Sequence, residues 1–525
     1  MKRNRDTTYD NSSLTHHSPN PHTGMSDREM NIALRRKYYK QNSGDVSKLS
    51  STENKFDGWN NDKITQFKEI LKSGTCSYER LHRLFIKNMN YIFYIHDEPI
   101  CGTVVSTEYE RGFFPCFSVT YSYFVYSSKK DLIIKEKNSM YTYSFAGSKN
   151  LDELRCEILT DEMKARLTDR GEKYLKYCRN FHHVDYQGAI IIPKWGGSDK
   201  ILTKGRVMID HTYYENTESR YHRYNDEDED SFNSEDIPKH KLYAFLGCYD
   251  LTKHRMWGLC VVENVLDINY NDEAFACLTL NEYLDIGSKK IKIKDLVKDL
   301  VKSKKFVDFD DIIEGKSCGM MFLLHGPPGV GKTLTAEATA EILHIPLYYL
   351  SAGELGSKSH DVEDGIKNVL ELTKRWNAIT LIDEADVFLE KRETSNLERN
   401  AVVSIFLKYL ESHTGIVFLT SNRVGNLDKA FLSRISLVLN YDEFTPEVKK
   451  EIWINLLKAS NIPPETIDVD SLVKYDLNGR QIKNIIKLSQ CIAVKDNEQC
   501  STSHIVSLCE YFEKHHKLDD AKNYC

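Results

Sequence analysis

The strongest constraint on the fold of this chain is a short glycine-rich stretch, residues 326–333, between an apolar run and a helical pattern. It fits the pattern G-x-x-x-x-G-K-[ST] and reads Gly326-Pro327-Pro328-Gly329-Val330-Gly331-Lys332-Thr333. Residues 320–325 before it are apolar enough for a buried strand. After it, Leu334, Ala338 and Ile342 recur at helical spacing. Because glycines let backbone N–H groups turn inward without a Cβ clash, the stretch predicts a phosphate-binding loop between a strand and a helix.

The side chains at the end of this loop predict its ligand. Lys332 would contact the β- and γ-phosphate oxygens of a nucleotide, and the Thr333 hydroxyl would ligate Mg²⁺. The helix that begins here adds the partial positive charge of its N-terminus. Residues 326–333 together with Leu334 are therefore the expected contacts of ATP or ADP, accompanied by Mg²⁺.

A pair of adjacent carboxylates, Asp383 and Glu384, ends a later apolar run at residues 379–382. In an open parallel sheet, such a strand delivers these residues beside the phosphate loop. Asp383 would hold Mg²⁺, directly or through water, and Glu384 would orient and deprotonate the attacking water. The pair indicates a hydrolase, because a phosphotransferase has no use for a water-activating base at this place.

Three more polar residues follow in a fixed order. The apolar run 415–420 predicts another strand, and the amide of Asn422 just beyond it can reach between the γ-phosphate and the water. Arg434 comes 12 residues later and precedes a further predicted strand. Arg480 lies at the start of an amphipathic helix that begins near residue 478. This order predicts an α/β parallel sheet followed by an amphipathic helix.

With these motifs in this order, the stretch from about residue 310 to residue 492 resembles the AAA+ ATPases. In finer detail it resembles a fungal-type group that carries an uncharacterised N-terminal domain ahead of one AAA module. The likeness is carried by the phosphate loop and by residues 309–316, 384–392, 398–404, 421–425 and 478–482. Weaker likeness continues upstream through residues 169–171 and 271–275. The resemblance implies a P-loop NTPase fold with a helical lid.

The resemblance also implies a ring, usually a hexamer, with ATP at the subunit interfaces. An arginine of the neighbouring subunit would then touch the γ-phosphate. Arg434 is expected in this role, with Arg399 as the alternative, because the chain has one arginine where many AAA proteins have two. Arg480 is expected to contact phosphates of its own subunit as the lid closes. In AAA+ rings that thread proteins, the segment that corresponds to residues 351–360 usually carries an aromatic residue that faces the pore. This segment contains no aromatic residue, which argues against a mechanism in which aromatic side chains hold an extended polypeptide.

Composition along the chain predicts four segments. Residues 1–57 are polar and charged, with few large apolar residues, which predicts a disordered tail. Residues 58–285 predict a mixed α/β domain interrupted by an acidic loop at 225–236. Residues 286–443 are the expected AAA+ α/β domain, and residues 444–525 the helical lid with a C-terminal tail.

Local patterns support the mixed character of the N-terminal domain. Apolar residues alternate at period two over 117–125, which predicts a half-buried strand. Met163, Leu167 and Tyr174 share one side of a helix predicted over 161–178. No nucleotide-binding pattern occurs in this part of the sequence.

Bulk composition narrows the partners and the compartment. The net charge of −6 argues against a general basic field, so nucleic acid is an unexpected partner. The 13 cysteines are scattered without a C-x-x-C pair, as is typical of reduced thiols. Neither a secretory signal nor a run of about 18 apolar residues is visible. A cytoplasmic or nuclear protein without a membrane span is expected.

Three functions are compatible with these motifs. The leading hypothesis is an ATP-driven machine that remodels a protein or complex, with the client chosen by residues 58–285. The second is a nucleotide-dependent switch or scaffold with slow turnover. The third is a nucleic-acid-dependent AAA+ machine, favoured by the Ser433-Arg434-Ile435 arrangement, which resembles clamp loaders, and opposed by the acidic balance.

Overall fold

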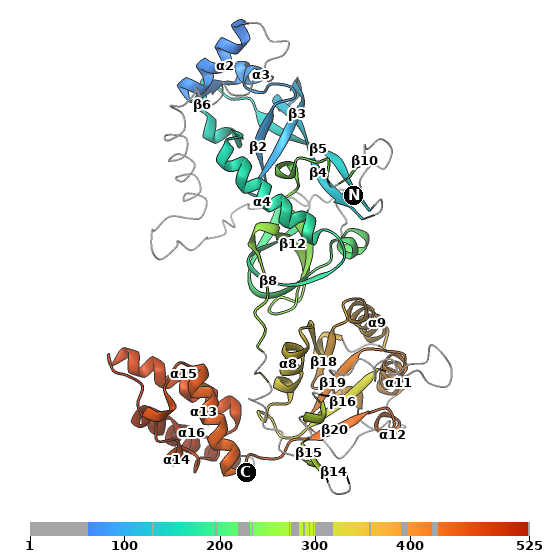
Figure 1. Ribbon diagram of the computed structural model, residues 1–525, viewed down its shortest axis with the longest axis vertical. Coiled ribbons are helices and arrows are strands. Elements are labelled where there is room, and N and C mark those ends of the chain that lie inside the picture. Colours follow the sequence, from blue (N-terminus) through green and yellow to red (C-terminus); the bar gives the residue numbers. More distant parts are fainter. Residues whose placement is uncertain are drawn as a thin grey trace, which may run out of the picture. The chain divides into compact units, whose positions relative to one another are not determined.

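The computed structural model of the protein describes most of the chain between Asn61 and Lys522 (Figure 1). The described residues are 61–128, 131–194, 197–218, 231–233, 235–271, 274, 283–286, 289–292, 295–297, 299, 319–355, 359–389, 397–422 and 429–522. The predicted tail at 1–57 lies outside them, as does most of the predicted acidic loop at 225–236. The chain divides into two compact units, the first reaching Leu266 and the second beginning at Asp267, with Leu251–Lys253 grouped with the second.

An antiparallel sheet of six strands, in the order β10-β5-β4-β3-β2-β7, opens the first unit. Its strands are β2 (Asn90–Ile95), β3 (Glu98–Glu110), β4 (Cys116–Ser127), β5 (Leu132–Tyr143), β7 (Cys156–Ile158) and β10 (Ser231–Phe232). The strand predicted over 117–125 is confirmed as part of β4. It is buried on both faces rather than half-buried as predicted, since Phe117 and Val119 are buried on one side and Ser118 and Ser122 on the other.

A second antiparallel sheet follows in the same unit. Its strands are β8 (His182–Lys194), β9 (Gly197–Ile209), β11 (Phe245–Asp250), β12 (Trp257–Val261) and β13 (Val265–Leu266). Because β12 pairs with β8 as well as with β11, the strands β8, β9, β11 and β12 form a closed ring of pairings. Further elements of the unit are α2 (Asn61–Ser73), β1 (Thr75–Ser77), α3 (Leu81–Leu84), β6 (Ser148–Asn150) and α5 (His211–Tyr213).

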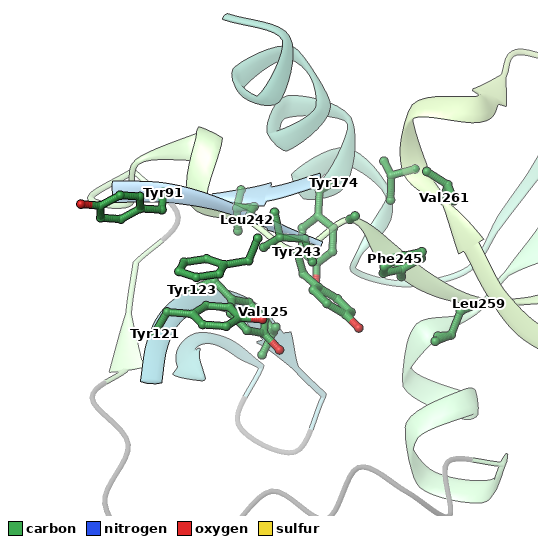
Figure 2. Close-up of a cluster of buried hydrophobic side chains, with 14 of the residues drawn as sticks. Tyr91, Tyr121, Tyr123, Val125, Tyr174, Leu242, Tyr243, Phe245, Leu259 and Val261 are labelled. Carbon is green, nitrogen blue, oxygen red and sulfur yellow. The ribbon is translucent and has the colours of Figure 1, made fainter. Parts of the chain in front are cut away.

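Helix α4 (Asp161–Tyr177) joins the two sheets of this unit through one apolar core, and it confirms the helix predicted over 161–178. Its N-cap is Thr160, whose hydroxyl accepts the N–H of Met163 at 3.2 Å. Figure 2 shows Tyr174 of α4 gathered with Tyr123 of β4 and Phe245 of β11. Tyr174 is fully buried, so α4 packs one face into this tyrosine-rich core.

The second unit contains a five-stranded sheet in the order β17-β18-β19-β16-β20, with all neighbours parallel. Its strands are β16 (Met320–His325), β17 (Leu347–Ser351), β18 (Ile379–Asp383), β19 (Ile416–Ser421) and β20 (Leu437–Asn440). Helices α8 (Lys332–Leu343), α9 (Ser359–Arg375), α10 (Asp386–Leu389), α11 (Leu397–Glu411) and α12 (Lys429–Leu432) accompany it, with a hairpin of β14 (Tyr283–Ile286) and β15 (Lys289–Lys292). The predicted parallel α/β sheet is confirmed, and the adjacency of β16, β18 and β19 brings their carboxyl ends to one edge.

Helix α8 ends at a contact with the stretch that opens the second unit. The residue that caps its C-terminus, His344, has a left-handed backbone, with φ 56°. The His344 ring stacks on Tyr270 with 4.2 Å between centroids, and the Tyr270 hydroxyl donates to the His344 carbonyl at 3.2 Å. The N–H of Asn271 donates to the Glu341 carboxylate at 2.9 Å. The stretch around residue 270 is therefore fastened to the end of α8.

A helical bundle completes the second unit and confirms the predicted lid fold. Its helices are α13 (Pro446–Ala459), α14 (Val469–Leu472), α15 (Gly479–Lys495) and α16 (Thr502–Lys522). They pack around Trp453, which is 1% exposed. Helix α15 begins with a capping box, in which Asn478 and Gln481 each accept the backbone N–H of the other. Among the described helices, none is long and apolar enough to cross a membrane.

Candidate active site

The loop between β16 and α8 needs glycine at three positions for its backbone path. Gly326, Gly329 and Gly331 have φ values of 149°, 81° and 101°, in a region that disfavours residues with a Cβ. A Cβ on Gly326 would also lie 2.2 Å from the carbonyl oxygen of Tyr441. Gly331 is the N-cap of α8, so the loop leads directly into the helix N-terminus. Residues 326–333 thus have the backbone that a phosphate cradle requires.

Lys332, the first residue of α8, is folded back over this loop. It is 8% exposed, and its Nζ donates to the carbonyl oxygens of Gly326 at 2.7 Å and Pro327 at 2.8 Å. It also donates to Oδ1 of Asn422 at 2.7 Å. Burial lowers the pKa of the ammonium, and the carboxylates of Asp383 and Asp386 oppose that shift. Two residues that the sequence assigns to the site, Lys332 and Asn422, are therefore in direct contact.

The carboxylate pair stands at the end of β18, beside β19. Asp383 accepts hydrogen bonds from the hydroxyls of Tyr349 and Thr420, the former at 2.7 Å. Glu384 has an exposed side chain and a left-handed backbone, with φ 55°. Its N–H donates to the Thr420 hydroxyl oxygen at 2.9 Å. A fixed carboxylate and a solvent-facing one are thus adjacent at the sheet edge, as metal binding and water activation require.

The two candidate arginines have different environments. Arg434 follows α12, and its guanidinium donates to the Glu411 carboxylate at 2.9 Å. Its side chain is 30% exposed, so this ion pair is open to exchange with another anion. Arg480 lies in the first turn of α15, is exposed, and contributes to lowering the pKa of Lys332. The side chain of the alternative residue, Arg399, lies outside the described part of the structure.

The lid helix α15 touches the phosphate loop directly. The N–H of Gly479 donates to the carbonyl oxygen of Gly329 at 3.1 Å. A Cβ on Gly329 would lie 2.7 Å from the side chain of Asn478. This contact places Arg480 next to the cradle, because Arg480 follows Gly479 at the start of the helix. The lid and the loop are therefore in contact through backbone atoms.

Replacing Gly329 with alanine is expected to weaken ADP binding about tenfold, because the free loop of the variant would relax from its left-handed backbone and ADP binding would have to restore it at a cost of about 1–2 kcal/mol. The added methyl would also push against Asn478. Calorimetric titration with ADP measures the effect. Gly353→Ala is the control, because its Cβ would meet only the Ser351 hydroxyl at 3.8 Å. Equal affinities for the two variants would contradict the expected role of this contact.

Several residues of the site escape prediction from the sequence. Tyr349, Thr420 and Asn478 contact predicted site residues but belong to no phosphate-binding pattern. Ser421 donates to the Asp386 carboxylate just behind the site. A usable signal exists for Thr420 and Ser421, since polar residues at the end of an apolar strand of a parallel sheet lie at its functional edge. No comparable signal exists for Tyr349, which lies inside a strand.

Among the described residues, no group of three or more metal-ligating side chains from His, Cys, Asp and Glu is present. A magnesium site would accordingly draw on the nucleotide and water as well as on protein oxygens. Asp383 and Thr333 supply oxygen donors, which suit a hard cation of this kind. The residues present fit Mg²⁺ bound together with nucleotide phosphates.

Comparison with known proteins identifies the domain. Residues 322–442 match the family described as "ATPase family associated with various cellular activities (AAA)". The chain is 29% identical over 263 residues to a putative 26S proteasome regulatory subunit homolog of Methanothermobacter thermautotrophicus, covering 47% of this chain and 66% of that protein. It is 28% identical to the ATP-dependent zinc metalloprotease FtsH 2 of Petrotoga mobilis, covering 43% of this chain and 37% of that protein.

A human protein is similar to a shorter part of the chain. The chain is 31% identical to the human ATPase family AAA domain-containing protein 3B, covering 34% of this chain and 29% of that protein. The chain thus spans less than two thirds of the length of each of these relatives. The shared part carries the phosphate loop and the carboxylate pair, with the geometry described above. Residues 322–442 are therefore an AAA ATPase domain.

Proposed function

We propose that the chain binds ATP with Mg²⁺ and hydrolyses it to ADP and phosphate. The observation that carries this proposal is the position of Asp383 and Glu384 at the end of β18. The neighbouring strand β19 leads to Asn422, which accepts a hydrogen bond from Lys332 of the phosphate loop. A carboxylate in this place activates water, and a general base of this kind contributes about 10²–10⁴-fold to a rate. Phosphate release by the purified chain tests the proposal, and a chain that binds no nucleotide contradicts it.

The residues around the phosphate loop are proposed to have different roles in binding and hydrolysing the nucleotide. Lys332 exchanges the carbonyl oxygens of Gly326 and Pro327 for β- and γ-phosphate oxygens, which are stronger acceptors for an ammonium. Asp383 and Thr333 would hold Mg²⁺, which neutralises charge on the phosphates when bound. Glu384 takes the proton of the water, and Asn422 orients that water. Arg480 contacts the phosphates of its own subunit from the lid.

We further propose that the chain assembles into a homo-oligomeric ring, a hexamer by resemblance, in which Arg434 reaches the nucleotide of its neighbour. The partly exposed ion pair with Glu411 supports this role, because such a pair exchanges at little cost. Asp383, Glu384 and Lys332 all belong to one subunit, and a positive group opposite them completes the charge balance at the γ-phosphate. Arg399 is the alternative residue for this role.

Mixing two inactive variants tests whether Arg434 acts between subunits. Arg434→Ala and Lys332→Ala chains are each expected to be inactive alone, whereas their mixture should regain part of the wild-type ATPase rate. The regained rate comes from interfaces that combine an intact phosphate loop with an intact arginine. Arg179→Ala, an exposed arginine of the first unit, is the control that should remain active without mixing. Absence of any regained activity would assign Arg434 to its own subunit.

The work driven by hydrolysis is proposed to be remodelling of a protein or complex, with the client selected by residues 58–285. Relatives named as a proteasome regulatory subunit homolog and an ATP-dependent metalloprotease support a protein client. The cysteines of the described part are free thiols, which supports a reducing compartment, the cytoplasm or the nucleus. Turnover that rises when a client is added supports this function, and slow turnover insensitive to every partner supports a nucleotide switch instead.

A further inference from the structure

The carboxylate of Asp383 is held from both sides by hydroxyl groups of the neighbouring strands. Tyr349 of β17 donates to Oδ2 at 2.7 Å, and Thr420 of β19 donates to Oδ1. Strand β18 lies between β17 and β19 in the sheet, so the donors come from opposite neighbours. Each carboxylate oxygen therefore accepts a hydrogen bond from a different strand.

Strand register explains why these two hydroxyls reach one carboxylate. Tyr349 pairs with Leu381, which lies two residues before Asp383 and so faces the same side of the sheet. Thr420 follows Leu419, the partner of Ile382, and thus comes level with Asp383. The Tyr349 ring packs against the apolar core between the sheet and α8. Packing fixes the ring, and its hydroxyl is presented at the edge of the sheet.

We infer that Tyr349 is a positioning residue that, together with Thr420, orients the Asp383 carboxylate for Mg²⁺–nucleotide binding; this inference rests on the ATPase function proposed above. A carboxylate oxygen has two lone-pair sites, so each oxygen keeps one for water or metal after accepting one hydrogen bond. The orientation of Asp383 is set before the ion arrives, which spares the rotamer entropy that binding would otherwise cost. Partners behind a metal ligand typically contribute about 10–100-fold to metal affinity or activity.

Thr420 has a second task at the same place. Its hydroxyl oxygen accepts the N–H of Glu384, and its carbonyl oxygen accepts the N–H of Ala385 at 2.9 Å. Glu384 has the left-handed backbone described above, which residues with a side chain rarely adopt. Thr420 thus orients the metal-binding carboxylate and also stabilises the backbone of the water-activating residue. Loss of the Tyr349 hydroxyl acts on Asp383, whereas loss of the Thr420 hydroxyl acts on both carboxylates.

The decisive experiment compares Tyr349→Phe with Tyr348→Phe, which removes the same atom from the adjacent residue of β17. Tyr348 faces the other side of the sheet, toward Trp376, with 6.3 Å between ring centroids. The measurement is the Mg²⁺ concentration that gives half-maximal binding of a fluorescent ADP analogue to the full chain. It is expected to rise about 10–100-fold in Tyr349→Phe and to stay at the wild-type value in Tyr348→Phe. At saturating Mg²⁺, the KM for ATP should be close to wild type while kcat is lower.

A second pair of variants keeps the test valid if Tyr349→Phe fails to fold, as thermal unfolding would reveal. Thr420→Val removes the hydroxyl at nearly constant volume, and Thr420→Ser retains it. The valine variant should raise the Mg²⁺ requirement and lower kcat, and the serine variant should restore both. Equal Mg²⁺ requirements in wild type, Tyr349→Phe and Thr420→Val would overturn the inference and leave the proposed ATPase intact. A wild-type chain without Mg²⁺-dependent nucleotide binding would instead overturn the proposed function.

Discussion

Replacing Glu384 with glutamine is expected to lower ATP turnover by about 10²–10⁴-fold, the contribution of a general base, while nucleotide affinity stays near wild type. Glutamine has the shape of glutamate but cannot take a proton from water at neutral pH. The Glu384 side chain is exposed, so the change leaves no buried polar group without a partner. Steady-state phosphate release, measured beside binding of a fluorescent ATP analogue, separates the two effects.

The matched control for this variant is Glu371→Gln, which neutralises an exposed carboxylate of α9 in the same domain. It should retain wild-type turnover, because a change of one surface charge has little effect on a distant site. If Glu384→Gln altered neither turnover nor the lifetime of bound ATP, the assignment of a hydrolase would be wrong. In the expected case, the variant holds ATP and with it the client, so affinity capture with Glu384→Gln and ATP should recover the client from an extract.

Replacing Lys332 with alanine is expected to reduce the affinity for ATP and ADP by at least about 100-fold. The ammonium is placed to make several charge-assisted hydrogen bonds to phosphate, each contributing about 1.5–3 kcal/mol. The fold should survive, because burial of this ammonium is unfavourable, as the lowered pKa of Lys332 indicates. Isothermal titration with ADP and thermal unfolding measure the two properties separately.

Lys367→Ala, at an exposed position of α9, is the control for loss of one positive charge in the same domain. This variant should bind nucleotide as wild type does, because the removed charge belongs to a side chain that faces solvent. Retained affinity in Lys332→Ala, at an unchanged melting temperature, would show that the loop at residues 326–333 does not hold the phosphates.

The sequence predicts the parts of the site that depend on local patterns. Glycines at 326, 329 and 331 are needed for left-handed backbone, and this need is visible without knowing the fold. The placement of Asp383 at a strand end follows from one apolar run. The parallel arrangement follows because such runs, buried on both faces, alternate with helical patterns. Local chemistry therefore predicts the loop, the carboxylate pair and the class of sheet.

The remaining parts depend on contacts between distant segments. Tyr349 meets Asp383 only because β17 is the neighbour of β18, and strand order is not encoded in either strand alone. The approach of Gly479 to Gly329 likewise depends on how the lid helices return to the sheet. In the first unit, the ring formed by β8, β9, β11 and β12 closes through two pairings between strands far apart in the sequence, β9 with β11 and β12 with β8. The roles of Arg434 and Arg480 stay predictions.

The fastening of Tyr270 and Asn271 to the end of α8 has a practical consequence for dissecting this protein. The same helix has Lys332 as its first residue and is capped at its C-terminus by His344, so the fastened end lies about 18 Å from the end that carries the predicted phosphate site. A truncated ATPase fragment that starts at β16 would cut away the partner of the other end. A fragment intended to contain the complete second unit should therefore begin no later than Asp267, where that unit begins.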